Sequence, residues 1–408
     1  MPSRPTILLA YEFGSGLGHL QRLIAVARGL ADDGRCVFAV PDVGLATPLL
    51  ACGFKPAMVP HQGVVWDAPR DPAARQVPTH TLADVLALFR FADADLLGPK
   101  LDAWRLLLDG IQPDLIVSDF APTLRLATQG RIPTVVVGNG YTVPPPGRDL
   151  PPMRPWQTVV PEESLAVERH ILSGVNRLRE AASQAPIAFL SDLFGGERSF
   201  ACTITEFDPY ARTRIEPVIW PFNVPVIAPG PEAHNRSGPD LFVYMAASHP
   251  GFAPLLSALN RLGRPTHLFV ADQDAQAVAR HCKGHIGILT RPADFAAVLP
   301  KTRLLVHHAG LGTAYAGLIA GTPQFVLPLN LEHLITARNL IEAGVAQGFS
   351  ANVNPTAEQM ETGMLALLDP DHIERARGVA ATVDVRRVSQ PTTPVLRACR
   401  ALLASSCA

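Results

Sequence analysis

The chain has 408 residues, of which 48% are hydrophobic and 17% are charged, and its formal net charge is −1. This composition is typical of a folded protein with ample core, and the near-neutral charge without a basic stripe argues against nucleic acid as a partner. The length exceeds what one hydrophobic core usually serves, so we expect two domains.

The six cysteines are scattered and form no CxxC pair, which favours free thiols over a zinc site or a disulfide framework. The first apolar run, at 6–13, is too short for a signal peptide. No segment reaches the roughly 18 apolar residues that a membrane span needs. We therefore expect a cytoplasmic protein with no integral membrane segment.

In the first half of the chain, short apolar runs alternate with segments of helical periodicity. Strands are predicted at 6–13, 36–40, 54–59, 113–119 and 132–138. Helices are predicted at 19–34, at 82–110 and in the segment that follows residue 161. Apolar strands separated by helices indicate a parallel sheet covered on both faces. Between the last strand and that segment, the Pro-rich loop 139–161 is long enough to suggest a functional role.

The same alternation restarts in the second half, after a stretch with six prolines at 217–239. The strands predicted there are 241–246, 265–271, 285–289, 302–308 and 323–329. The fold class is therefore α/β, with two Rossmann-like, doubly wound parallel-sheet domains that face a cleft. We expect domains at 1–220 and 240–385, a linker at 221–239, and a C-terminal helix in 386–408 that crosses back to the first domain.

The first motif is "FGSGLGHLQRL" at 13–23, where glycines open the first helix. The dinucleotide fingerprint GxGxxG would need a third glycine where His19 stands, although Asp42 at the end of the second strand leaves a dehydrogenase as an alternative. An imidazole at a helix N-terminus is held neutral by the helix dipole and suits a general base. A histidine that only caps the helix is the other interpretation.

The second motif is "LIVSDF" at 115–120, in which Asp119 closes an apolar strand. If this strand lies near the first, the Asp119 carboxylate can reach His19, fix its tautomer and stabilise the imidazolium, as in catalytic triads. Capping of the next helix is the alternative role for Asp119.

The third motif is "HHAGLGT" at 307–313, between a strand and a helix. Neighbouring side chains on a strand point to opposite faces, so His307 and His308 do not suit one metal ion. Glycines admit a ligand close to the backbone, and a helix N-terminus attracts anions. These features, with the Thr313 hydroxyl, predict a diphosphate cradle.

The segment "HHAGLGTAYAGLIAGTPQFVLPLNLEH" at 307–333 resembles the donor signature of GT-B, family-1 (UDP-glycosyltransferase-like) glycosyltransferases of the bacterial or sterol type. The first two motifs are similar to the family's GxGH turn and strand-end aspartate, in the same order along the chain. The resemblance covers nearly the whole chain.

The resemblance implies inverting, metal-independent transfer of a sugar from a nucleotide-sugar co-substrate, UDP- or dTDP-linked, with no other cofactor. His19 would deprotonate the acceptor hydroxyl and Asp119 would orient His19. The donor residues implied are Gly16, Arg291, His308, Gly310, Gly312, Thr313, Glu332 and His333.

This chain departs from the family pattern at several donor positions. Thr290 stands where the plant form has a tryptophan that stacks on uracil, and Ala293 and Ala316 replace two polar residues of the plant form. His333 replaces the usual glutamine beside the sugar-binding acid, and Ala309 replaces a glycine. These departures leave the nucleotide and the sugar open.

An apolar, Pro-rich wall in the first domain suits a small lipophilic or aromatic acceptor, with Trp66, Tyr141 and Trp156 as its candidate contacts. Packing of these aromatics within their own loops is the alternative.

Other functions compatible with the fold are a glycolipid-forming transferase at a membrane surface, a non-catalytic nucleotide-sugar-binding homologue and a nucleotide-sugar epimerase. The oligomeric state is open, with a homodimer as one expectation.

Overall fold

The computed structural model describes residues 4–14, 18–41, 46–53, 61–62, 79–128, 130–222, 224, 239–270, 272, 275–349, 353, 355–383 and 390–406. The chain divides into two compact units. The first unit contains residues 1–223 together with 390–408, and the second contains 224–389.

The first unit is built on a parallel sheet of six strands in the order β3-β2-β1-β4-β5-β6. Its strands are β1 (Thr6–Tyr11), β2 (Arg35–Val40), β3 (His61–Gln62), β4 (Leu115–Asp119), β5 (Thr134–Gly138) and β6 (Arg198–Ala201). Its helices are α1 (Gly18–Gly29), α2 (Ala46–Ala51), α3 (Leu82–Leu88), α4 (Ala94–Ile111), α5 (Pro122–Thr128), α6 (Glu162–Ala181) and α15 (Thr393–Ser406).

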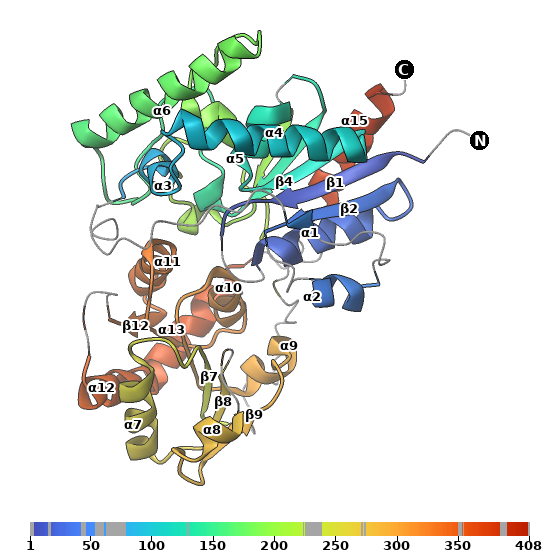
Figure 1. Ribbon diagram of the computed structural model, residues 1–408. Helices are drawn as coiled ribbons and strands as arrows, with labels where there is room; N and C mark the ends of the chain where they lie inside the picture. The colour runs from blue at the N-terminus through green and yellow to red at the C-terminus, as the bar shows by residue number, and fades with distance from the viewer. Residues whose placement is uncertain are drawn as a thin grey trace. The chain divides into compact units, whose positions relative to one another are not determined.

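Helices cover both faces of this sheet, as the continuous burial of β1 requires (Figure 1). On one face, Leu20 and Leu23 of α1 and Val395 and Cys399 of α15 pack in one core with alternate residues of β1. Helix α15 contacts α1, β4 and β5. The last helix of the chain therefore belongs to the first unit.

The second unit repeats the plan with six parallel strands in the order β12-β11-β10-β7-β8-β9. Its strands are β7 (Leu241–Met245), β8 (Thr266–Val270), β9 (Ile286–Leu289), β10 (Leu304–His307), β11 (Gln324–Val326) and β12 (Ala346–Gly348). Its helices are α7 (Phe252–Leu262), α8 (Ala275–Ala279), α9 (Phe295–Val298), α10 (Leu311–Ile319), α11 (Leu331–Glu342), α12 (Ala357–Leu367) and α13 (Pro370–Ala381).

Both sheets have the Rossmann order, in which the first and fourth strands of the unit are neighbours. The chain leaves these two strands in opposite directions, and ligands of such folds bind at the crevice between their carboxyl ends. In the first unit this point lies between β1 and β4, and in the second between β7 and β10. The predicted α/β class with two doubly wound parallel sheets is confirmed.

The prediction of one long helix at 82–110 is wrong, because the chain forms two helices, α3 and α4, with a break between them. Arg90 takes the left-handed conformation with φ of 60°. Asp93 then caps α4 by accepting hydrogen bonds from the backbone N–H groups of Asp95 and Leu96. The short edge strands β6 and β12 were missed, and the strand predicted at 54–59 lies outside the described residues.

Candidate active site

His19 and Asp119 meet at the carboxyl edge of the first sheet. Strands β1 and β4 pair in parallel with Tyr11 opposite Asp119, and His19 follows β1 as the second residue of α1. His19 Nδ1 lies 3.0 Å from Asp119 Oδ1. This distance suits a hydrogen bond, but the two groups are not aligned for one in this geometry. The sheet order therefore brings together the imidazole and the carboxylate that the first two motifs supply.

Arg22 is a third member of this group, and the sequence interpretation missed it. Its guanidinium donates to Asp119 Oδ2, the carboxylate oxygen that does not face His19. His19 and Arg22 are three residues apart on α1, so they lie on one helix face, and this spacing was the available signal. Asp119 has no exposed surface. Burial acts to raise the pKa of Asp119, but the charges of Arg22 and His19 outweigh it and hold the pKa below its usual value.

Aromatic rings and a bare backbone surround the His19 imidazole. The Tyr11 ring stacks on it at a centroid distance of 5.3 Å and an interplanar angle of 16°, and the Phe120 ring lies 6.4 Å away. Gly14, whose φ is 112°, runs past the opposite ring nitrogen, Nε2. With Nδ1 turned to Asp119, the outer nitrogen Nε2 is the one left for a substrate proton.

A small apolar cavity lies beside Asp119 at the ends of β4 and β5. The space inside it that a water-sized sphere can enter is only about 10 Å³, which is about enough for one water molecule. Its lining includes Phe120, Ala121, Val136, Leu193 and Phe194. Phe120 contacts both this cavity and the His19 ring. The cavity is therefore too small to seat an acceptor group in this structure, and the sequence interpretation did not identify it.

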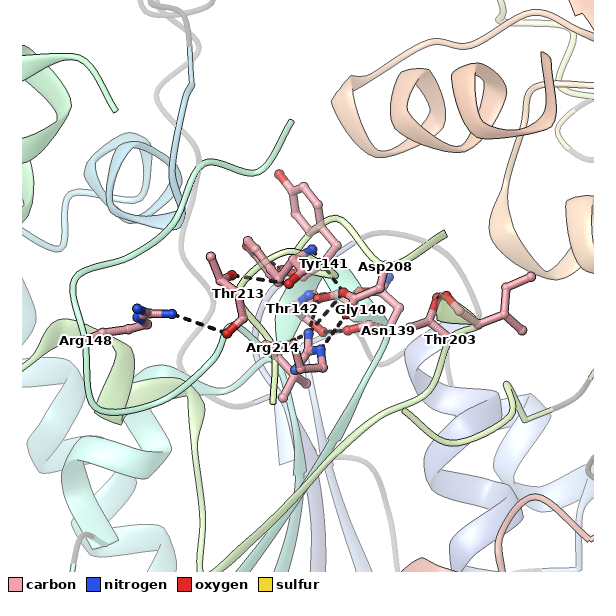
Figure 2. Close-up of polar contacts among 12 residues, drawn as sticks. Asn139, Gly140, Tyr141, Thr142, Arg148, Thr203, Asp208, Thr213 and Arg214 are labelled. Atoms are coloured by element: carbon pink, nitrogen blue, oxygen red, sulfur yellow. Dashed lines mark hydrogen bonds and ion pairs between the residues drawn. The ribbon is translucent and has the colours of Figure 1, made fainter. Parts of the chain in front are cut away.

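The turn after β5 carries Tyr141, one of the predicted acceptor contacts. Figure 2 shows the Tyr141 ring pointing away from the polar network that holds its backbone. In that network, Arg214 forms a buried ion pair with Asp208 at 2.6 Å and donates to the carbonyls of Gly140 and Val143. The turn that presents the Tyr141 ring is thereby fixed.

The structure does not place the other two predicted acceptor aromatics in one site with Tyr141. Trp156 is partly buried in the segment before α6. Trp66 lies outside the described residues, as does the predicted donor contact Gly16.

In the second unit, His307 holds the turn between β10 and α10. It is fully buried, its Nε2 lies 2.8 Å from Oε1 of Gln324, and its Nδ1 accepts from the Ala309 N–H. Gln324 also donates to the Ala314 carbonyl of α10. Burial lowers the pKa of His307 to about 3, so this imidazole is neutral. His307 is thus a structural residue of the turn.

The turn itself is strained at Ala309, which is buried with φ of 65°. This conformation favours glycine, the residue that the resembling family has at this position. The bond from the Ala309 N–H to His307 supports the conformation. Strain of this kind is commonly kept at binding turns.

His308, Gly310 and Thr313 surround the N-terminus of α10. His308 is half-buried, and a Cβ on Gly310 would lie 3.0 Å from its Nε2, so glycine there leaves room for the ring. Gly312 is exposed, and Thr313 is 9% exposed. The first N–H groups of a helix have no partner within it and carry partial positive charge. This arrangement can bind an anion such as a diphosphate.

Helix α11 brings Glu332 and His333 to the same edge of the sheet. Asn330 caps α11 by accepting from the His333 backbone N–H, which places both side chains in the first turn. The His333 ring lies 4.7 Å from the His308 ring. The structure therefore brings His333 next to the α10 turn.

Arg291 is exposed and follows β9. In the sheet, β9 is separated from β10 by β7 and β8. The segment after it folds back, so that Phe295 contacts Tyr244 of β7 at 5.7 Å. Tyr244 in turn lies 6.4 Å from His308. The segment that follows the predicted donor contact Arg291 thus reaches the His308 side of the sheet through Tyr244.

Among the described residues, no group of three or more His, Cys, Asp or Glu side chains is arranged to hold a metal ion. In the same part of the chain, no helix is both long and apolar enough to cross a bilayer.

No family model matches the chain. Over 145 residues, the chain is 30% identical to an uncharacterized glycosyltransferase of Mycobacterium tuberculosis. The aligned segment covers 35% of this chain and 32% of that protein, which is about a third of the relative's length. Over 93% of the chain and 94% of the relative, it is 23% identical to the L-demethylnoviosyl transferase of Streptomyces niveus.

Solved structures resemble the chain over nearly its whole length. The glycotransferase of kitacinnamycin has a TM-score of 0.68 and 20% identity, over 98% of this chain and 99% of that one. The glycosyltransferase VinC, solved with dTDP, has a TM-score of 0.63 and 15% identity, over 97% and 99%. The chain has the GT-B fold. Its sequence and its fold are similar to those of glycosyltransferases.

Proposed function

We propose that this protein is an inverting, metal-independent glycosyltransferase. It transfers a sugar from a UDP- or dTDP-linked donor to a hydroxyl of a small lipophilic or aromatic acceptor. The observation that carries the proposal is the group formed by His19, Asp119 and Arg22 at the switch point of the first sheet. The whole-chain likeness to the demethylnoviosyl transferase supports it.

His19 is the general base in this proposal. Its Nε2 takes the proton of the acceptor hydroxyl as that oxygen attacks the anomeric carbon of the donor. Asp119, on the other ring nitrogen, stabilises the imidazolium that forms. Attack from the face opposite the leaving group inverts the anomeric configuration. The ionised state of Asp119, which Arg22 maintains, suits this role.

The leaving group is a nucleoside diphosphate, whose negative charge rises as the glycosidic bond breaks. In our proposal the N–H groups that open α10, the Thr313 hydroxyl and His308 receive this charge. Fixed donors aimed at developing charge are among the largest contributions to catalysis. Glu332 then binds the sugar hydroxyls.

The aromatic rings of Tyr11 and Phe120 beside the imidazole support a lipophilic or aromatic acceptor, because they give His19 apolar surroundings. Tyr141 is a further candidate contact for that acceptor. Among the proteins of similar fold, the spinosyn rhamnosyltransferase is solved with its spinosyn aglycone. A natural-product acceptor is therefore the class to test first.

The first experiment is a thermal-shift screen with UDP, dTDP and GDP and their sugars. We expect one nucleotide class to raise the melting temperature. Stabilisation by none of them would contradict the proposed function.

The second experiment separates the base from donor binding. His19→Ala should abolish transfer and leave nucleotide affinity unchanged, whereas His170→Ala, an exposed histidine of α6, should change neither. Retained turnover in His19→Ala would remove His19 as the base. Nucleotide binding by the wild-type protein without transfer to any acceptor would favour the non-catalytic homologue.

A further inference from the structure

The segment after β6 carries a buried ion pair that holds the turn at 139–143, which follows β5. The Asp208 carboxylate binds the Arg214 guanidinium through both of its oxygens, at 2.6 Å to Nε and 3.1 Å to Nη2. The side chains of Asp208 and Arg214 are only 1% and 5% exposed. A carboxylate and a guanidinium that share two hydrogen bonds have a fixed mutual geometry. The pair is therefore a rigid support inside the first unit.

The same guanidinium also binds the turn. Its Nη2 donates to the carbonyl of Val143 at 2.7 Å and to the carbonyl of Gly140 at 3.3 Å. Figure 2 shows Arg214 beside Gly140 and Asp208. Between the two bound carbonyls along the chain, the carbonyl of Tyr141 accepts from the hydroxyl of the buried Tyr210 at 3.2 Å. Three carbonyls of the turn are thus held by side chains of one short segment.

The turn packs against the ion pair with no room for an added atom. A Cβ on Gly140 would lie 2.9 Å from Asp208 Oδ1 and 3.0 Å from the methyl group of Thr203. Within the turn, Asn139 Oδ1 accepts from the Thr142 N–H at 2.9 Å. Movement of the turn towards the pair is blocked by contact, and movement away from it breaks the hydrogen bonds. The backbone of the turn therefore has one favoured position.

The turn begins beside the proposed catalytic pair. A Cβ on Gly138, the last residue of β5, would collide with Thr142 Oγ1 and would lie 3.5 Å from Asp119 Oδ1. This carboxylate oxygen is the one that faces His19. Tyr141 precedes Thr142, and its ring points away from the polar network (Figure 2). The ion pair thus fixes the backbone that carries the Tyr141 ring at the edge of the sheet where Asp119 lies.

We propose that Asp208 and Arg214 are positioning residues for the acceptor: they hold the turn at 139–143 so that the Tyr141 ring meets the acceptor in one orientation. The inference rests on the proposed function, because it takes the acceptor to be lipophilic or aromatic. Both members of the pair are buried, so they act on the acceptor only through the turn. An aromatic ring offers a large contact area, and a backbone fixed in advance loses little entropy when the acceptor binds.

The test uses variants that release the turn without removing a buried charge. Loss of either charge would leave the other buried without its partner, which is strongly destabilising. Arg214→Lys keeps the positive charge, but an ammonium group cannot reproduce the guanidinium's bonds to two carboxylate oxygens and two carbonyls. Gly140→Ala pushes the turn away from Asp208 and leaves the pair itself in place. Tyr141→Ala removes the ring that the turn presents.

Arg105→Lys and Gly110→Ala are the matched controls, and both positions lie on α4. Arg105 forms an ion pair with Asp102 at the surface, at 2.9 Å. Gly110 is exposed and has no heavy atom within 4 Å of its Cβ position among the described residues. The controls therefore repeat the same chemical changes where no turn is held.

The reaction measured is transfer of glucose from UDP-glucose or dTDP-glucose to 4-methylumbelliferone, a flat phenol whose fluorescence reports the transfer. Calorimetry gives the Kd of UDP and dTDP, and melting curves report whether each variant is folded. If the wild type binds this phenol without glucosylating it, the Kd from a fluorescence titration takes the place of KM.

We expect Arg214→Lys, Gly140→Ala and Tyr141→Ala each to raise the KM for the phenol about 10-fold, and to leave the Kd of the nucleotide unchanged. A 10-fold change corresponds to about 1.4 kcal/mol of binding free energy. Arg214→Lys should have no further effect on KM in the Tyr141→Ala background, because both changes remove the same contact. A purely structural role would lower the active fraction, and with it kcat, but would not change KM. Both controls should behave as the wild type.

An unchanged KM in folded Arg214→Lys would overturn the inference and leave the proposed function intact. Additive effects of Arg214→Lys and Tyr141→Ala would do the same, because they would show that the ion pair does not act through the ring. If Arg214→Lys does not fold, Gly140→Ala takes its place in both comparisons. A wild type that binds a nucleotide but neither binds nor glucosylates the phenol would contradict the proposed aromatic acceptor, and the inference would fall with it. Binding of no nucleotide would contradict the proposed function itself.

Discussion

The Gly14 backbone lies directly against Nε2 of His19. A Cβ on residue 14 would stand 2.3 Å from that nitrogen and 2.7 Å from the adjacent ring carbon Cδ2. No side chain fits there unless the imidazole moves. The glycine of the first turn thus keeps open the nitrogen that would receive the acceptor proton.

Gly14→Ala should therefore lower kcat at least about 100-fold, because displacement of a catalytic group by about 1 Å has effects of this size. Both the collision and the positive φ oppose an alanine at this position. Gly147→Ala is the matched control, since Gly147 has φ of 69° and no heavy atom near its Cβ position among the described residues. Steady-state kinetics and melting temperatures of both variants separate the collision from backbone strain. Equal kinetics in the two would exclude a role for Gly14 at the base.

Arg22→Met should move the acid limb of the kcat/KM profile to higher pH. Arg22 is the largest influence that lowers the pKa of Asp119 against its burial. Without the guanidinium the carboxyl binds its proton at a higher pH, and the protonated carboxyl no longer stabilises the His19 imidazolium. The measurement is kcat/KM from pH 4 to 8. A variant with reduced kcat but an unshifted acid limb would show that Arg22 acts only through packing.

Glu12→Gln should remove part of the pH dependence of stability. Glu12 is buried at the end of β1, where its carboxylate accepts from Trp104 and from the Thr123 N–H. Burial nevertheless raises its pKa to about 7. A group whose pKa is higher in the folded than in the unfolded protein stabilises the fold when the pH is below its unfolded pKa. This stabilisation is lost as the pH rises towards 7.

At about 1.4 kcal/mol per pKa unit, the loss for Glu12 is on the order of 3 kcal/mol between pH 4.5 and 7. The free energy of unfolding of Glu12→Gln should fall less than that of the wild type over this range. Urea denaturation at each pH provides the comparison. Glu168, whose pKa burial also raises to about 7, is present in both proteins and cancels in the difference. Parallel curves for the two proteins would contradict the expectation.

Thr313→Ala should weaken nucleotide binding about 10- to 100-fold, the usual effect of one hydrogen bond to a charged group. Thr313 stands at the start of α10, where its hydroxyl can meet a phosphate oxygen. Thr362→Ala, at an exposed threonine of α12 that bonds within its own helix, is the control. Calorimetric Kd values for UDP and dTDP give the answer. Unchanged affinity in Thr313→Ala would contradict the diphosphate cradle.

Much of this protein was predictable from local patterns. Buried apolar runs and helical periodicity predicted most strands of both sheets, because these signals are read within one element. His19, Asp119 and the "HHAGLGT" turn stood out because each lies at or just after the end of a strand that the pattern predicts. The edge strands β6 and β12, of four and three residues, are too short to carry such a pattern.

The tertiary structure decided what lies next to these residues. The neighbouring position of β1 and β4 brings Asp119 to His19, and the turn of α1 brings Arg22 to the same carboxylate. In the second unit, the fold brings the ring of His333 to 4.7 Å from the ring of His308, although the two residues lie in separate segments of the chain. The sequence determined which chemical groups the strand ends carry, since strand and turn signals are local. Only the order of the strands decided which groups meet, because that order is fixed by burial across the whole sheet.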